Sequence, residues 1–145
     1  NRIYGCDDCQ LICPWNKFAK LGQEVDFQAR ENFDQVPLLT LFSWSESDFL
    51  KRTEGSPIRR IGWECWQRNI AIALGNAPFS DDILQALLEK KEHPSSLIRE
   101  HVLWAITQQE EKHRLHVLAQ NSVVKNERLT LRLIRSVEKG LPRDA

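Results

Sequence analysis

The chain has 145 residues, with 20 basic and 20 acidic side chains and no methionine. This length suits about one domain, and a net charge of zero does not favour a general nucleic-acid binder, although it allows local basic patches. No apolar run approaches the roughly 18 residues that a membrane span needs, so we expect no membrane partner. Because the sequence opens inside a dense motif without a methionine, we expect a C-terminal part of a longer protein.

Three cysteines dominate the first segment: Cys6, Cys9 and Cys13, in the order C-x2-C-x3-C-P. Thiolates this close together can turn toward one soft metal centre, and the spacing matches the second half of the bacterial ferredoxin run. We therefore favour iron–sulfur chemistry over a packing role and over structural zinc, which more often uses two tight cysteine pairs. The pattern does not resemble a secreted disulfide framework, so we expect a reducing, cytoplasmic location.

The proline after Cys13 suggests how the ligands are divided. In two-cluster ferredoxins the proline-linked cysteine binds the other cluster from its neighbours. Applied here, Cys6 and Cys9 bind one 4Fe–4S cluster and Cys13 binds the second, and each cluster needs further cysteines that this chain lacks. Trp15, beside the motif, either shields a cluster from water or is a plain hydrophobic anchor.

Residues 1–36 are expected to form the second half of a ferredoxin-like module with a connecting arm. One helical turn runs through residues 7–12 and ends there, because proline disfavours helical geometry in the residue before it. The arm over residues 16–34 mixes charged residues with lone aromatics, and we expect it to be irregular.

Residues 37–145 are expected to form a helical domain, in which capping residues and Gly or Pro signals mark the helix ends. The first predicted segments are a short apolar piece at 38–42 and a helix capped by Ser45 or Ser47 that stops near Gly55. A long helix follows at 58–74 and ends at the Gly75–Asn76 pair. The last three helices are one that follows Ser80 and closes at 93–94, one from 97 to about 108 before a charged stretch, and one at about 124–139.

No alternating strand pattern occurs, so the predicted fold class is all-α. Residues 56–59 are similar to 96–99 at an offset of 40, and residues 69–74 are similar to 101–106 at an offset of 32. The two offsets differ, which requires an insertion in one unit or chance similarity. Helix pairs of this length stack into solenoids, so we expect a HEAT-like helical repeat domain preceded by the C-terminal edge of a bacterial ferredoxin-like two-cluster module.

Several other side chains could be functional or structural. Cys65 lies in the middle of the long predicted helix and is expected to pack in the core, with a ligand role as the alternative. The four histidines show no metal-ligand grouping with carboxylates, which favours surface or capping roles. The remaining tryptophans are expected to make core or inter-helix contacts: Trp44, Trp63, Trp66 and Trp104.

Basic residues form a local group on the long helix, at Arg59, Arg60 and Arg68, with Lys17 near the cysteine motif. They form either a solvated face or a set of phosphate contacts, which arginine and lysine make without reading base sequence. The sequence alone leaves both interpretations open.

The first 17 residues, NRIYGCDDCQLICPWNK, closely resemble the second cluster motif of the epoxyqueuosine reductase family. Residues 56–60, 68–69 and 73–76 are similar to the start of that family's HEAT-like C-terminal domain. The resemblance covers essentially the whole chain and fades after about Gln109. It implies a cytoplasmic oxidoreductase that converts epoxyqueuosine to queuosine at the wobble position of tRNA, with electrons passing from two 4Fe–4S clusters to cobalamin.

The resemblance also implies roles for individual residues. The catalytic acid and most of the cobalamin pocket lie in the N-terminal part of the family, so no catalytic residue is expected here, and the fragment alone is expected to be inactive. Cys6 and Asp7 are expected to approach the cobalamin edge. The other expected partners are an external electron donor and the tRNA anticodon stem-loop, contacted by a monomeric protein through Lys17, Arg59, Arg60 and Arg68.

Two other functions compete with this interpretation. The first is a ferredoxin-like electron-transfer module fused to a helical interaction domain, with no substrate of its own. The second is a related cobalamin and iron–sulfur enzyme such as a reductive dehalogenase. The HEAT-like tail argues against the dehalogenase, which has no need of a nucleic-acid platform.

Overall fold

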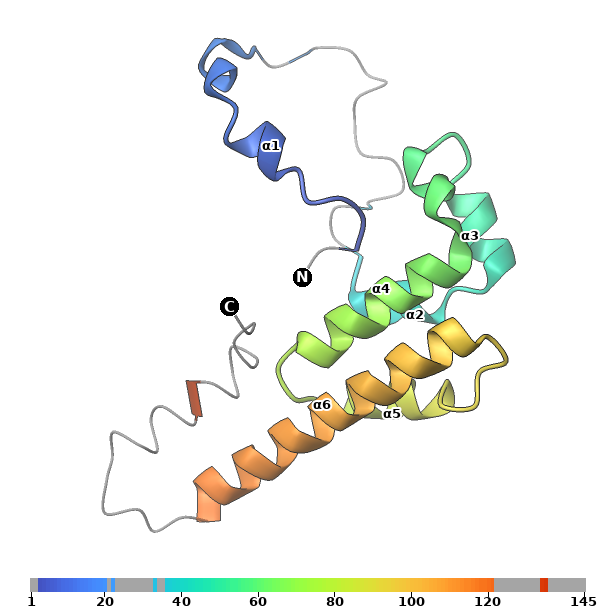
Figure 1. The fold of residues 1–145 in the computed structure, drawn as a ribbon, viewed down its shortest axis with the longest axis vertical. Coiled ribbons are helices and arrows are strands. Elements are labelled where there is room, and N and C mark those ends of the chain that lie inside the picture. The colour runs from blue at the N-terminus through green and yellow to red at the C-terminus, as the bar shows by residue number, and fades with distance from the viewer. Residues whose placement is uncertain (1–2, 21, 23–32, 34–35, 122–133, 136–145) are drawn as a thin grey trace.

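A computed structural model describes residues 3–20, 22, 33, 36–121 and 134–135 (Figure 1). Its elements are α1 (Asp8–Leu11), the 3-10 helix η1 (Pro14–Phe18), α2 (Leu38–Ser43), α3 (Glu46–Arg52), the 3-10 helix η3 (Pro57–Ile61), α4 (Gly62–Asn76), α5 (Asp81–Glu89) and α6 (Ser96–Asn121). All of these are helical, which confirms the all-α prediction for the described residues. None of their helices is long and apolar enough to cross a membrane.

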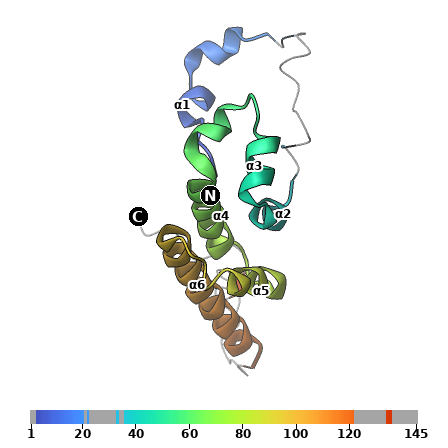
Figure 2. The ribbon, with the colours of Figure 1, turned by 90° about the vertical axis from the view of Figure 1, so that its right-hand side faces the viewer.

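Helix α4 is the centre of the helical body. It packs against α2 and α3 on one side and runs beside α6 on the other, while α5 packs on α6 (Figures 1 and 2). The core forms where these helices meet, around Phe49, Ile70 and Val102, all completely buried. Each such side chain stabilises the fold by roughly 1.5–3 kcal/mol relative to its exposed state.

Helix α3 begins with a reciprocal cap. The Ser45 hydroxyl accepts a hydrogen bond from the Asp48 amide (3.2 Å), and the Asp48 carboxylate accepts one from the Ser45 amide (3.1 Å). The Ser45 hydroxyl also bonds the Asp48 carboxylate at 2.6 Å, and these bonds hold the pKa of Asp48 below its ordinary value. Of the two predicted caps, Ser45 is therefore the one used.

The long helix predicted at residues 58–74 is divided in two. Residues Pro57–Ile61 form the 3-10 helix η3, and α4 starts only at Gly62, whose φ of +75° suits glycine. The helix ends at Asn76, within the Gly75–Asn76 pair that marks its predicted end. Gly75, in its last turn, is buried against α6 and allows close helix packing.

Helix α5 follows Ser80 as predicted, but the Ser80 side chain makes no capping bond. The helix ends at Glu89, before the predicted close at residues 93–94. Beyond Glu89 the backbone forms tighter turn bonds, from the Lys90 amide to the Leu87 carbonyl and from the Lys91 amide to the Leu88 carbonyl, in place of α-helical ones. The Lys90 ammonium bonds the Phe42 carbonyl of α2 and, at 2.7 Å, Gln67 Oε1 of α4.

Helix α6 is longer than predicted. It begins at Ser96 and runs unbroken to Asn121, so the predicted end near residue 108 is wrong and the charged stretch continues the helix. Two polar residues of that stretch are buried, Gln109 and Lys112, because they bond the C-terminal carbonyls of α4. The predicted helix at 124–139 lies outside the described residues, apart from 134–135, which are helical.

The predicted core positions are partly right. Trp44 and Trp66 are buried, and Trp63 is half-buried with its Nε1 donating to the Trp44 carbonyl at 3.1 Å. Trp104 is 40% exposed, and Cys65 is half-buried rather than in the core. Trp104 makes the predicted inter-helix contact, at Gly75 of α4, whereas Cys65 lies at the edge of the buried face of its helix.

Candidate functional site: the cysteine segment, the arginines and the α4–α6 cavity

The cysteine segment is built from two short helical turns. Asp7, with a left-handed φ of +51°, precedes α1, and Cys13 precedes η1. The Asn16 amide joins the two turns by donating to the Gln10 carbonyl (2.5 Å) and, more weakly, to the Leu11 carbonyl (3.4 Å). Residues 7–18 thus fold into one compact loop, and Cys6 directly precedes it.

The three thiols of the cysteine motif are free. Cys6 and Cys9 are exposed, Cys13 is half-buried, and none forms a disulfide. Within the described residues, no three His, Cys, Asp or Glu side chains gather into a metal site. Three thiolates also fall short of the four that a 4Fe–4S cluster takes. The loop therefore offers part of a ligand set.

Around these cysteines the surface is strongly apolar. Leu11, Ile12 and Trp15 are 70%, 81% and 72% exposed, and Trp15 packs on Phe18, with ring centroids 5.4 Å apart. Lys17 is exposed in the same turn, with its ammonium 4.9 Å from the Phe18 ring centroid.

Hydrogen bonds connect this segment to the helical body. The Tyr4 hydroxyl donates to the Pro57 carbonyl at 3.1 Å, and the Asn69 amide of α4 donates to the Ile3 carbonyl at 2.7 Å. Asn69 Oδ1 accepts a bond from Arg68 Nε at 2.8 Å. Arg68 therefore lies at the point where the cysteine segment meets α4.

A cavity of about 400 Å³ lies between the cysteine segment and the helical body. Cys6 and Asp7 line it together with mostly apolar side chains, among them Ile58 and the buried Trp66. A space of this size holds a drug-sized molecule or one edge of a larger cofactor.

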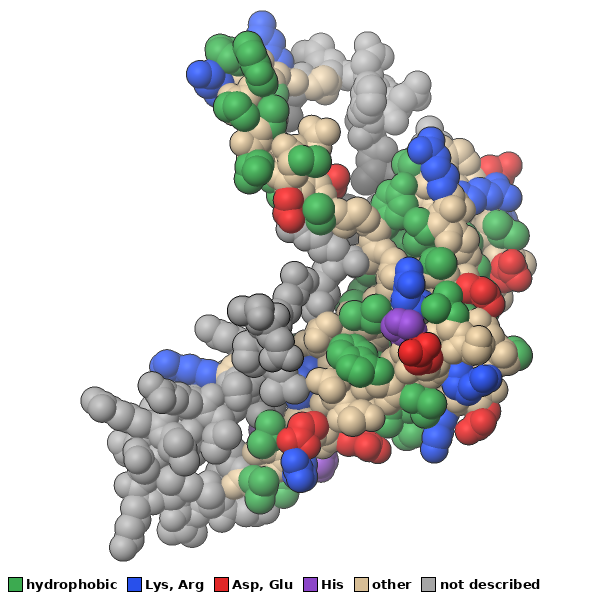
Figure 3. Space-filling model, viewed as in Figure 1, with side chains coloured by type: hydrophobic (Ala, Val, Ile, Leu, Met, Phe, Trp, Pro, Cys, Tyr) green, Lys and Arg blue, Asp and Glu red, His purple; other side chains and the backbone are tan. Residues whose placement is uncertain are grey.

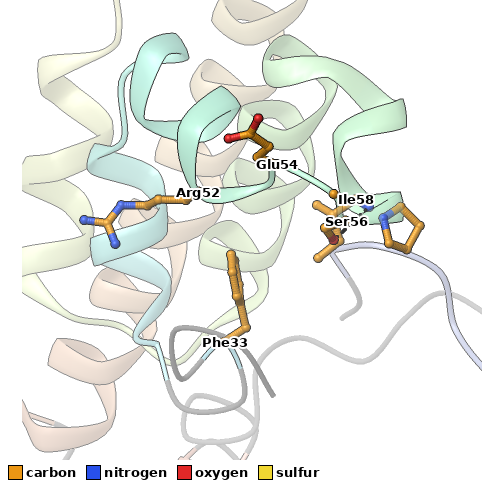
Figure 4. A pocket seen from close by; sticks show the side chains of 7 residues that line it. Phe33, Arg52, Glu54, Ser56 and Ile58 are labelled. Atoms are coloured by element: carbon orange, nitrogen blue, oxygen red, sulfur yellow. Dashed lines mark hydrogen bonds between the residues drawn. The ribbon is translucent and has the colours of Figure 1, made fainter. Parts of the chain in front are cut away.

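A neighbouring cavity of about 330 Å³ lies under the turn between α3 and η3 (Figure 4). Phe33 and Glu54 line it, but the guanidinium of Arg52 points away from Ser56 and Ile58 and packs over the Trp44 ring, 5.2 Å from its centroid. Its polar groups do not converge on one point, so we assign it no chemistry.

The predicted basic residues are spread over three places. Arg59 and Arg60 are exposed neighbours on η3, Arg68 is half-buried on α4, and Lys17 lies in η1. On the face shown in Figure 3, Lys and Arg side chains lie at several separate places and alternate with Asp and Glu. Among the described residues, the four predicted cations are therefore local and do not form one continuous basic patch.

Sequence reasoning missed a further cavity between α4 and α6, of about 310 Å³. It is lined by Ile72 of α4 and by Glu100, His101 and Trp104 of α6. The three α6 residues stand at i, i+1 and i+4, a spacing that puts them on one helical face. That spacing was the available signal, but the partner residue on α4 was not predictable.

Known proteins resemble this chain closely. A protein from Shewanella oneidensis is 53% identical over 147 aligned positions, one from Escherichia coli is 54% identical over 146, and one from Xanthomonas campestris is 61% identical over 108. The first two alignments cover 100% of this chain and the third covers 74%. All three relatives are named epoxyqueuosine reductase.

The chain matches the C-terminal part of epoxyqueuosine reductases. This confirms the resemblance predicted from the cysteine motif and from the residues around Arg59 and Gly75. The chain spans about a third of the length of the epoxyqueuosine reductases it matches, 35% and 37% of the first two. No protein-family model and no solved structure matches it.

Proposed function

We propose that this chain is part of a cytoplasmic, monomeric enzyme that reduces epoxyqueuosine to queuosine at the wobble position of tRNA. The observation that carries the proposal is the identity of more than 50% to epoxyqueuosine reductases over the whole chain, including the cysteine motif. Loss of the epoxide oxygen as water consumes two electrons and two protons. The enzyme therefore needs an external electron donor and a route for those electrons.

The cysteine loop fits one end of such a route. Its free, accessible thiols are the ligand type that 4Fe–4S clusters take. Cys6 and Cys9 would hold one cluster and Cys13 the second, with the other ligands supplied from outside this chain. When bound, the clusters would supply single electrons and a cobalamin would supply the electron pair that reduction of the epoxide requires.

The cavity beside Cys6 and Asp7 is our candidate for the cobalamin edge. Its apolar walls, which include Ile58 and Trp66, can cover part of a flat macrocycle and exclude water from it. Asp7 contributes a carboxylate to this mostly apolar lining. The Asp7 carbonyl accepts hydrogen bonds from the amides of Gln10 and Leu11 in α1. These bonds hold the left-handed backbone of Asp7 on its C-terminal side.

We also propose that the helical body is a HEAT-like platform for the anticodon stem-loop. A similar contact occurs in both halves of this body. Gln67 and Lys90 donate hydrogen bonds to the carbonyls at the end of α2, and Gln109 and Lys112 donate to those at the end of α4. Gln67 and Gln109 lie 42 positions apart, within the HEAT repeat length of about 40–47 residues, whereas Lys90 and Lys112 lie 22 apart, so only the glutamines follow the repeat.

The cations for RNA contact are Lys17, Arg59, Arg60 and Arg68. Arg59 and Arg60 are exposed and adjacent, which suits them to neighbouring phosphates. Arg68 lies at the junction of the cysteine segment and α4, where bound RNA would reach the redox centre and the platform together.

The activity is tested with the full-length protein, reconstituted with iron, sulfide and cobalamin, and with tRNA that carries epoxyqueuosine. With a low-potential reductant we expect queuosine, detected by mass spectrometry of the nucleosides. If the clusters are reduced and reoxidised but no queuosine forms, the protein is an electron-transfer module and the proposal is wrong.

The ligand assignment has its own test in the same protein. We expect Cys9→Ser and Cys13→Ser each to lower the bound iron by about one cluster, because each removes one thiolate. The matched control is Cys65→Ser, which lies outside the motif and should keep the full iron content. A normal iron content in Cys9→Ser would show that Cys9 is not a cluster ligand.

A further inference from the structure

The cavity between α4 and α6 has the features of a small built site. Trp104, on its wall, keeps 40% of its surface exposed. Its ring is nevertheless held in place, because it packs against the backbone of α4 at Gly75, where an added methyl group would lie 2.6 Å from Trp104 Cζ3. An exposed but fixed aromatic ring is a pre-organised stacking surface.

Two hydrogen-bond acceptors stand beside this ring. Glu100 is exposed and lines the cavity with its neighbour His101. The Nδ1 of His101 lies 2.9 Å from the Leu97 carbonyl; since a carbonyl only accepts, Nδ1 is the donor and Nε2 of the neutral ring is an acceptor. The cavity therefore suits a flat group that carries N–H donors on one edge.

The charges around the cavity indicate which part of an RNA it can bind. A phosphate is disfavoured there because Glu100 would repel it. The amino and imino edge of an unpaired base is favoured, since carboxylates accept hydrogen bonds from such N–H groups. Arg68 precedes Ile72 by four residues, one turn of α4, and so places a cation for the adjoining phosphate on the same helical face.

We propose that this cavity binds one unpaired nucleobase of the RNA substrate, stacked on Trp104 with its N–H edge toward Glu100 and His101. This inference rests on the proposed function, since that function supplies the RNA. It assigns the α4–α6 face a role in recognising a base, in addition to the phosphate contacts of the arginines.

The test measures binding of the full-length protein to an anticodon stem-loop RNA by fluorescence anisotropy. Trp104→Leu keeps an apolar side chain against Gly75 but has no π-face, and we expect it to bind about tenfold more weakly. Trp104→Phe should bind within about twofold of the natural protein. The matched control is Leu103→Ala, which removes an exposed α6 side chain outside the cavity and should leave the affinity unchanged.

A series of RNAs, each lacking the base at one unpaired position, locates the contact. We expect one position at which base removal costs the natural protein about tenfold but costs Trp104→Leu nothing, because both changes remove the same stacking contact. The salt dependence of binding should be the same in the natural protein and in Trp104→Leu, because stacking releases no counterions.

The possible results separate the two levels of the proposal. If the natural protein forms queuosine and binds the stem-loop, but Trp104→Leu binds equally well, the base site is wrong and the proposed function stands. If Trp104→Leu and Trp104→Phe lose affinity equally at every RNA position, the ring is structural and the base site is again wrong. If the natural protein does not bind the stem-loop, both proposals are overturned.

Discussion

At the scale of single residues, Gly75 has a role that its sequence position conceals. It stands in a Gly–Asn pair of the kind that usually ends a helix, yet it is buried within α4. Its missing side chain leaves room for the Trp104 ring and for the backbone of Ala105, which would lie 2.6 Å and 3.0 Å from an added methyl group. The glycine thus sets how closely α4 and α6 approach each other.

Gly75→Ala should therefore destabilise the protein. Alanine favours a helix over glycine by about 1 kcal/mol, but the clash with a backbone atom of α6 cannot be relieved by one side chain. We expect overpacking to prevail and to lower the free energy of unfolding by about 1–2 kcal/mol, measured by urea denaturation. Gly22→Ala is the control, because nothing lies within 4 Å of its added methyl group; equal stability of the two variants would contradict the packing role.

Some residue assignments are predictable from sequence and others are not. The cap at Ser45 follows from the local spacing of Ser45 and Asp48, which needs no knowledge of the rest of the chain. The cavity around Trp104 is not predictable, because it depends on how α4 and α6 align. For the same reason the sequence does not decide between a core position and an inter-helix contact for Trp104, which in the structure packs against Gly75 of α4 with 40% of its surface exposed.

At the scale of elements, two lysines close the ends of helices. The Lys112 ammonium donates to the Gly75 carbonyl (2.5 Å) and the Ala77 carbonyl (2.6 Å). Lys90 does the same for α2. In a sequence both residues indicate solvent, which explains why the pattern ends α6 before the charged stretch that contains Lys112. The bonds join distant helices, so sequence periodicity does not show them.

Lys112→Met tests how much this cap contributes to the free energy of unfolding. Methionine fills the same space but leaves the Gly75 carbonyl without its buried donor, at a cost of about 1–3 kcal/mol in the free energy of unfolding. Thermal unfolding followed by circular dichroism measures the change. Lys91→Met, at an exposed position between α5 and α6, should be neutral; a Lys112→Met protein as stable as that control would show that the cap contributes nothing.

Lys90 predicts a pH dependence of stability. Burial lowers the pKa of Lys90 to about 8, from an ordinary value of 10.5. Between about pH 8 and 10.5 the unfolded chain holds a proton that the folded chain has released, so this group makes the free energy of unfolding rise with pH in that window. Below about pH 8 the group adds no pH dependence, because both states are then protonated.

The measurement compares urea denaturation at pH 7.5 and pH 9.5 in the natural protein and in Lys90→Met. The difference in stability between the two proteins should shift in favour of the natural one at the higher pH. A constant difference across the window would mean that the pKa of Lys90 is not lowered by folding.

At the scale of the whole molecule, a neutral chain must bind RNA through local charge. Arg59→Glu with Arg60→Glu should weaken binding of the full-length protein to the anticodon stem-loop. The slope of log affinity against log salt should also fall by roughly 0.7–0.9 for each phosphate that the variant no longer neutralises. The control replaces two exposed lysines elsewhere, Lys51→Glu with Lys91→Glu, for the same change in net charge. Equal affinities of the two double variants would mean that Arg59 and Arg60 form a solvated surface and do not contact phosphates.

The burial of Lys112 also makes it a chemical reporter. Its pKa is lowered by burial, which by itself would raise the fraction of the side chain present as the reactive free amine. The side chain is only 1% exposed, however, so an acylating reagent cannot reach it while α6 covers the end of α4. In lysine footprinting read by mass spectrometry, we expect Lys91 to be labelled at once and Lys112 only at the rate at which α4 and α6 separate. One protein sample would then report how often this helix pair opens, with and without bound RNA.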